Sequence, residues 1–164
     1  MDQRNQPEPI SAAEQRMRTR RVTGIGSGLG FVGSMEYRHL YSQSGGAQYC
    51  IGPSVDDDII VVYAEGFERD ANPDDFCLEA LVAHECGHQR LTRDPNLRKV
   101  LVKFPGEELE EVLASLVGSI LLGETEAATT LVWKATAELG DMGIAGESCV
   151  QLIERLRQLL RNFL

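Results

Sequence analysis

Residues 72–90 read NPDDFCLEALVAHECGHQR, and this pattern predicts a long helix in the middle of the chain. Asn72 is a favourable N-cap, and Pro73 suits the first helical position. The two aspartates that follow complement the positive end of the helix dipole. We therefore expect one helix from Asn72 to about Arg90.

Short β-strands are expected before this helix and further helices after it. Residues 59–63 read IIVVY, a β-branched run behind an acidic turn, and form the clearest strand. The other candidate strands cover residues 35–41 and 48–51, and the other candidate helices cover 11–21, a short stretch after Pro95, 106–122, 124–139 and 146–163. Strands first and helices after predict an α+β fold.

The chain has 164 residues, which is enough for one domain of ordinary size with a hydrophobic core. We expect residues 1–22 to be a mobile N-terminal segment that contains the short helix. Residues 23–164 are expected to form a single domain, with a small N-terminal β-sheet, the helix of residues 72–90 and a C-terminal helical bundle.

The charge of the chain makes nucleic acid an unlikely partner. The net charge is −9 at pH 7, whereas phosphate binding needs clustered lysine and arginine. The one basic cluster, RMRTRR at residues 16–21, is interpreted as a solvated helix end.

The polar N-terminus lacks the apolar core of a secretory signal, and the longest uncharged apolar stretch, 112–122, is too short to cross a bilayer. We therefore expect a cytoplasmic protein with no membrane contact.

A literal GxGxxG motif occurs at Gly28, Gly30 and Gly33. This motif binds dinucleotides when a strand leads into it and a helix leaves from it. Here an arginine-rich segment precedes the motif, and no helical apolar stripe follows. We therefore interpret it as a turn or the margin of a strand.

The segment HECGH places His84 and His88 four residues apart, so a helix projects both imidazoles from one face. Two imidazoles so placed can bind one Zn²⁺, with Glu85 alongside to take a proton from a water molecule that the ion activates. The resulting hydroxide would attack a peptide carbonyl polarised by the same ion. Cys86 projects from another side of the helix and is not expected to be a ligand.

A catalytic zinc ion needs a third protein ligand. Asp94 is one candidate, but Leu91 stands where the chain would need a glycine to turn back to the metal. Glu111 is the better candidate, because it lies opposite the apolar stripe of its predicted helix. Its face continues through Ala114, Ser115 and Gly118, and such small residues let another helix approach closely.

The two segments AHECGH at 83–88 and EEVLAS at 110–115 resemble the glutamate-zincins. Among these, the chain is most similar to the small ImmA/IrrE-like metallopeptidases and the related ArdC-type domain. The resemblance implies a zincin-like fold, a glutamate ligand on a second helix and peptidase activity on intracellular proteins. It leaves the register open between Glu111, Glu110 and Glu108.

The sequence thus predicts zinc-dependent hydrolysis of a protein or peptide substrate, with His84, His88 and Glu111 as metal ligands and Glu85 as general base. The strand at 59–63 is expected to hold an extended substrate by strand addition. The alternative is a zincin-fold regulatory module of little activity that acts on a transcription factor or nucleic acid. His39, Tyr37, Tyr41 and Tyr63 are interpreted as packing or surface residues rather than oxyanion donors. The substrate and the oligomeric state stay open.

Overall fold

A computed structural model of the chain describes residues 6–42, 45–68 and 77–164. Within these ranges it has three strands and six α-helices, which makes the fold α+β, as predicted. The chain divides into two compact units, residues 1–82 and 83–164, and the boundary falls inside helix α2. The expectation of one domain over residues 23–164 stays a prediction.

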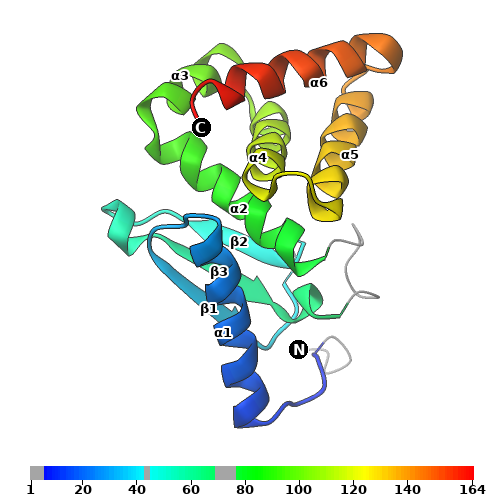
Figure 1. Cartoon of the computed structure of the whole chain (residues 1–164). Helices are drawn as coiled ribbons and strands as arrows, with labels where there is room; N and C mark the ends of the chain where they lie inside the picture. Colours follow the sequence, from blue (N-terminus) through cyan, green and yellow to red (C-terminus); the bar gives the residue numbers. More distant parts are fainter. Residues whose placement is uncertain (1–5, 43–44, 69–76) are drawn as a thin grey trace. The chain divides into compact units, whose positions relative to one another are not determined.

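The first unit contains a mixed three-stranded sheet in the order β1-β3-β2 (Figure 1). The central strand β3 is parallel to β1 and antiparallel to β2. The strands are β1 (Ser34–Arg38), β2 (Ala47–Cys50) and β3 (Ile59–Tyr63), with short 3-10 helices at η2 (Val55–Asp57) and η3 (Ala64–Gly66). All three strands lie where the sequence predicted them.

The central position of β3 overturns one expectation. Residues 59–63 were expected to hold a substrate by strand addition, but both edges of β3 are already hydrogen-bonded to its neighbours. An incoming strand has no free backbone groups to pair with at that position. The apolar run IIVVY belongs to a buried central strand, in which residues 60–63 are all buried.

Helix α1 (Ala12–Gly28) packs against β1, as Figure 1 shows, and it runs seven residues beyond the expected end at residue 21. Ser11 caps it by accepting a hydrogen bond from the Glu14 backbone N–H. Glycines inside a helix are unfavourable, and α1 contains three of them after residue 21. Gly26, however, lies against Met35 of β1, and a Cβ atom there would be 2.7 Å from the Met35 sulfur. Packing on the strand therefore outweighs the poor helix propensity.

The GxGxxG motif follows a helix and precedes a strand, which is the reverse of the order that binds dinucleotides. Gly28 ends α1, whereas Gly30 and Gly33 have positive φ angles of 81° and 126° in the turn to β1. A Cβ atom at Gly33 would lie 2.2 Å from the Asp58 carbonyl oxygen. The glycines thus serve a tight turn, as predicted.

The arginine-rich segment of α1 makes contacts inside the first unit. Arg18 donates hydrogen bonds to Glu14 and to the Tyr37 hydroxyl, at 3.0 and 2.7 Å. Arg21 lies 3.6 Å from a Glu79 carboxylate oxygen. Arg18 is therefore partly buried in contacts within this unit, while Arg16, Arg20 and Arg21 are exposed, as expected for a solvated helix end.

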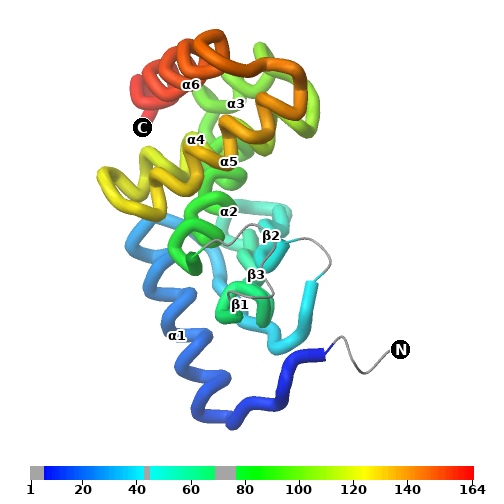
Figure 2. The backbone as a smooth tube through the Cα atoms, turned by 90° about the vertical axis from the view of Figure 1, so that its right-hand side faces the viewer, coloured from blue at the N-terminus to red at the C-terminus, as the bar shows by residue number. Residues whose placement is uncertain are grey.

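The second unit is helical, and its helices α4 and α5 lie side by side (Figures 1 and 2). Its helices are the C-terminal part of α2 (Leu78–Arg93), α3 (Pro95–Lys103), α4 (Glu107–Leu122), α5 (Glu126–Asp141) and α6 (Gly146–Arg161). The predicted N-cap at Asn72 lies outside the described residues, but the expected helix start there is wrong, because Cys77 is not helical and α2 begins at Leu78, six residues later than predicted. The other helix positions agree with the prediction to within a few residues.

Helix α4 forms the centre of the second unit, since residues 112–119 are all buried. The predicted apolar stripe packs into a core shared with α3, α5 and α6, in which Leu113, Leu116, Leu139 and Leu160 are fully buried. The opposite face, with its small residues, is buried as well. Burial on both sides is the physical reason why this helix combines leucine and valine with alanine, serine and glycine.

None of the helices in the described part of the chain combines the length and the apolar composition that a membrane span requires.

Candidate metal centre

The two histidines of the HECGH segment lie on one face of α2, as helical spacing predicts. Their ring centroids are 4.8 Å apart, and the ring planes meet at 85°. The two Nε2 atoms are 3.2 Å apart. His84 is 7% exposed, and the His88 side chain is 14% exposed. Both imidazoles are therefore held in packed surroundings with their Nε2 atoms converging.

Glu111 of α4 completes the cluster. One carboxylate oxygen lies 2.9 Å from His84 Nε2, and the other lies 3.2 Å from His88 Nε2. These three residues offer one ligand atom each, all within 4.8 Å of one another. About half of the Glu111 side chain, 47%, is exposed, so the cluster opens to solvent on that side. A catalytic zinc ion needs such an open position for water or substrate.

The spacing of these atoms fits a zinc ion. Around a tetrahedral zinc with bonds of about 2.0–2.1 Å, neighbouring ligand atoms lie about 3.3–3.4 Å apart. The two Nε2 atoms are 3.2 Å apart, and the two oxygens of Glu111 lie 2.9 Å from His84 Nε2 and 3.2 Å from His88 Nε2, so each of these separations differs from that by a few tenths of an ångström. Small side-chain rotations would be enough to admit the ion.

Each imidazole also has a polar partner on its other nitrogen. His84 Nδ1 lies 2.9 Å from the Ser115 hydroxyl, and His88 Nδ1 lies 3.6 Å from a Glu110 carboxylate oxygen. If Nε2 binds a metal, Nδ1 carries the proton, which His84 donates to the Ser115 hydroxyl, whereas the longer contact of His88 with Glu110 is electrostatic. These contacts orient both rings with Nε2 toward the common point.

The electrostatics of the cluster favour a cation. Burial opposes the charged form of His88, but its hydrogen bond with Glu111 and the negative charges of Glu85 and Glu111 outweigh burial and raise the His88 pKa. The hydrogen bonds with His84 and His88 hold the Glu111 pKa well below its usual range, although burial opposes this. Glu111 is therefore ionised at neutral pH and available as a ligand.

A small cleft of about 210 Å³ adjoins the cluster and is lined by Glu108, Glu111, Glu138, Asp141 and Met142. Burial raises the pKa of the Glu138 carboxyl, and the charge of Lys134 partly offsets this. Glu138 Oε2 has no hydrogen-bond partner within residues 6–42, 45–68 and 77–164. The cleft brings further negative charge to the open side of the three candidate ligands.

The structure therefore brings together His84, His88 and Glu111, the three residues that the sequence predicted as ligands, and their binding of a metal stays a prediction. Asp94 is not part of the cluster: its carboxylate caps α3 and accepts hydrogen bonds from the Asn96 and Leu97 backbone N–H groups. Glu110 contacts His88 on the nitrogen that faces away from Glu111. Among the described residues, the three-dimensional arrangement selects Glu111.

Glu85 follows His84 on α2 and is 9% exposed. Burial, the largest effect on the His88 pKa, lowers it, and the negative charge of Glu85 is one of the smaller causes that raise this pKa, after the hydrogen bond with Glu111. Cys86, also inside the segment, is 2% exposed and lies outside the cluster, as predicted. The role of Glu85 as a base stays a prediction.

The contact of Ser115 with His84 was not predicted from the sequence, in which Ser115 was considered only as a small residue. Ser115 lies four residues after Glu111 on the same face, so the helical spacing that selected Glu111 also places Ser115 beside a histidine.

The tyrosine hydroxyls that were considered as oxyanion donors make hydrogen bonds within the first unit. Tyr37 bonds His39, Tyr41 donates to Glu68 and Tyr63 donates to Gln48.

No protein-family model, curated protein or solved structure matches this chain.

Proposed function

We propose that this chain is a zinc-dependent metallopeptidase of the zincin type that hydrolyses peptide bonds in proteins. One observation carries the proposal: two imidazole nitrogens and a carboxylate come together within 2.9–3.2 Å of one another at a place that is open to solvent. Histidine and glutamate are the ligands that catalytic zinc takes in peptidases, with three protein ligands and one open position.

Bound at this point, zinc would lower the pKa of a coordinated water molecule and polarise a peptide carbonyl. The protein's own groups supply the remaining steps. Glu85 accepts the proton of the attacking water and passes it to the leaving amine. Ser115 and Glu110 hold the two imidazoles in orientation.

The order of elements supports the zincin interpretation. A small sheet precedes α2, which carries both histidines, and α4, which carries the glutamate, follows after the short helix α3. The close approach of α2 and α4 at small residues is what a carboxylate on α4 needs in order to reach the histidines on α2.

The first experiment is elemental analysis of the purified wild-type protein beside His88→Ala and Glu111→Ala. We expect near-stoichiometric zinc in the wild type and little in either variant. The matched control is Glu107→Ala, which removes an exposed carboxylate from the first turn of the same helix and should retain zinc. Zinc retained by Glu111→Ala would contradict the ligand assignment.

The second experiment separates a peptidase from a binding module. Glu85→Gln should keep zinc but lose the cleavage of denatured protein substrates, measured as new peptide termini by mass spectrometry. A wild-type protein that holds zinc and produces no new termini would favour the regulatory module instead.

A further inference from the structure

A second pocket lies in the helical unit, away from the cluster residues, between the start of α5 and the last turns of α6. Its volume is about 520 Å³, and its lining includes Thr125, Ala128, Thr129, Val132, Arg157 and Arg161. This volume falls in the range of small-molecule sites, about 300–1,000 Å³. Its residues have no part in the proposed peptidase chemistry.

Two arginines give the pocket its chemistry. Arg157 and Arg161 are four residues apart on α6, so both guanidinium groups project from one face. Arg157 Nε is buried and has no hydrogen-bond partner in the part of the chain that the structure describes. A buried donor without a partner destabilises the protein, so an acceptor that a ligand brings to this edge of the guanidinium group would be favourable.

The two guanidinium groups have no carboxylate partner among the described residues, although the chain has a net charge of −9. Burial and the positive charge of Arg161 lower the pKa of Arg157. The two neighbouring positive charges lie beside the pocket and repel each other. An anion placed between them would relieve the repulsion.

We propose that this pocket binds the phosphate group of a small molecule, held by Arg157 and Arg161. Guanidinium groups donate paired hydrogen bonds to phosphate oxygens, and two of them balance the two charges of a phosphate monoester. A carboxylate would neutralise only one of the two. The phosphate alone is much smaller than a pocket of about 520 Å³, so the remainder of the molecule occupies the rest.

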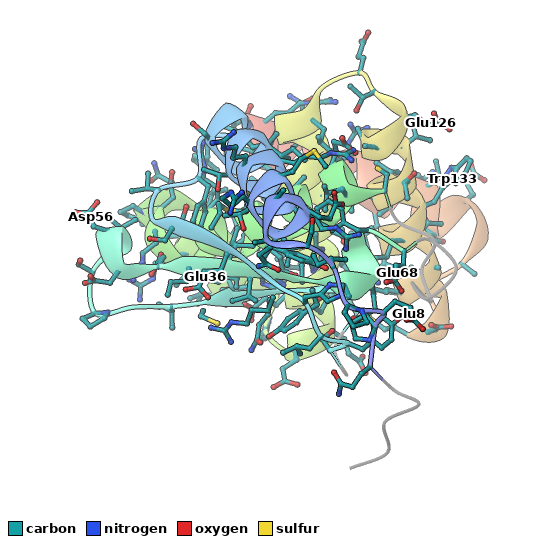
Figure 3. The ribbon with its side chains drawn as sticks, turned by 90° about the horizontal axis from the view of Figure 1, so that it is seen from below. Glu8, Glu36, Asp56, Glu68, Glu126 and Trp133 are labelled. Atoms are coloured by element: carbon teal, nitrogen blue, oxygen red, sulfur yellow. The ribbon has the colours of Figure 1, made fainter. Side chains whose placement is uncertain are left out.

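Two glutamates also line the pocket, and their removal should affect phosphate binding in the opposite sense to removal of the arginines. Glu124 and Glu126 are exposed, and Figure 3 shows Glu126 projecting outward from α5. Their negative charges oppose a bound anion at a distance. Glu124→Gln, which precedes the helix and leaves its cap Thr125 in place, should therefore strengthen phosphate binding.

The experiment is isothermal titration calorimetry of the full chain with inorganic phosphate, glycerol 3-phosphate and adenosine 5′-monophosphate in a phosphate-free buffer of low ionic strength. We expect at least one ester to bind more tightly than inorganic phosphate. Arg157→Gln and Arg161→Gln should each weaken its binding about tenfold, the loss expected for one charge-assisted contact. The matched control is Arg155→Gln, an exposed arginine of the same helix outside this pocket, which should change the affinity less than about twofold.

Three results would overturn the proposal. In the first, none of the three probes binds. In the second, Arg155→Gln weakens binding as much as the two pocket variants, which would indicate non-specific attraction. In the third, binding persists unchanged in both pocket variants, which would place the phosphate elsewhere, for example on a zinc ion.

Discussion

Gly87 of α2 lies directly against the backbone carbonyl of Ala114 of α4, and a Cβ atom at Gly87 would be 2.1 Å from that oxygen. A second contact repeats the relationship in reverse, since a Cβ atom at Gly118 of α4 would lie 2.7 Å from the Ala83 oxygen of α2. The atoms in the way are backbone atoms and cannot swing aside. These two glycines therefore set the separation of the helices that carry the histidines and Glu111.

Gly87→Ala should destabilise the protein by about 2 kcal/mol or more, because the added methyl group forces the two helices apart. The same displacement should withdraw Glu111 from the histidines and lower zinc affinity. Chemical denaturation measures the first effect, and a competition titration with a chelator measures the second.

The matched control for this substitution is Gly140→Ala in α5. No atom lies within 4 Å of the position a Cβ would take there, so alanine should stabilise the helix by about 0.5–1 kcal/mol. Equal behaviour of the two variants would show that the contact of Gly87 with Ala114 does not limit the helix separation.

Ser115→Ala should weaken zinc binding about tenfold or more while leaving the three ligands in place. Its hydroxyl is the partner of His84 Nδ1, at 2.9 Å, and groups that orient a metal-binding histidine affect affinity on this scale. Chelator competition measures the change. Ser119→Ala is the control, since this buried serine of the same helix donates to the Leu116 carbonyl instead. A similar loss of zinc affinity in both variants would argue against a specific role for Ser115.

Cys86 should resist thiol reagents in the folded protein even though it lies between the two histidines in sequence. It is 2% exposed, and burial raises the pKa of its thiol to about 12. We expect Cys50 and Cys77, which are half-buried, to react first, and Cys86 and Cys149 only after unfolding. Mass spectrometry of timed labelling locates each modification. Rapid native labelling of Cys86 would mean that α2 packs less tightly than the structure shows.

Tyr41 should give a pH-dependent contribution to stability at high pH. Its hydroxyl donates a 2.5 Å hydrogen bond to Glu68, and this bond, with burial and the Glu68 charge, raises the Tyr41 pKa from 10.0 to about 12. Because the Tyr41 pKa is higher in the folded than in the unfolded protein, its hydroxyl stabilises the fold. This contribution is fully present below pH 10 and is lost as the pH rises to about 12.

Denaturant unfolding of the wild type and Tyr41→Phe at both ends of this interval tests the prediction. The difference between the two proteins should shrink as the pH rises. In Glu68→Gln, which keeps an acceptor without the charge, absorbance titration should show the Tyr41 pKa closer to 10. A stability difference that is constant with pH would contradict the assignment.

Local sequence determined the elements and the faces they present. Residues 59–63 form a strand because they are β-branched, and Glu107–Leu122 forms a helix with an apolar stripe because the 3.6-residue period is local information. The spacing of His84 and His88 alone was enough to place both rings on one side of α2. The small residues after Glu111 indicated a close helix contact, which the structure contains.

Only the tertiary structure decided which partners these faces meet. It placed β3 between two neighbours, which removed the predicted edge for a substrate, and it extended α1 to Gly28 through packing on Met35. It also selected Glu111 rather than Glu110 or Asp94, and it paired Ser115 with His84. Such choices depend on contacts between residues far apart in the chain, where a shift of one residue on a helix turns a carboxylate about 100° away from its target.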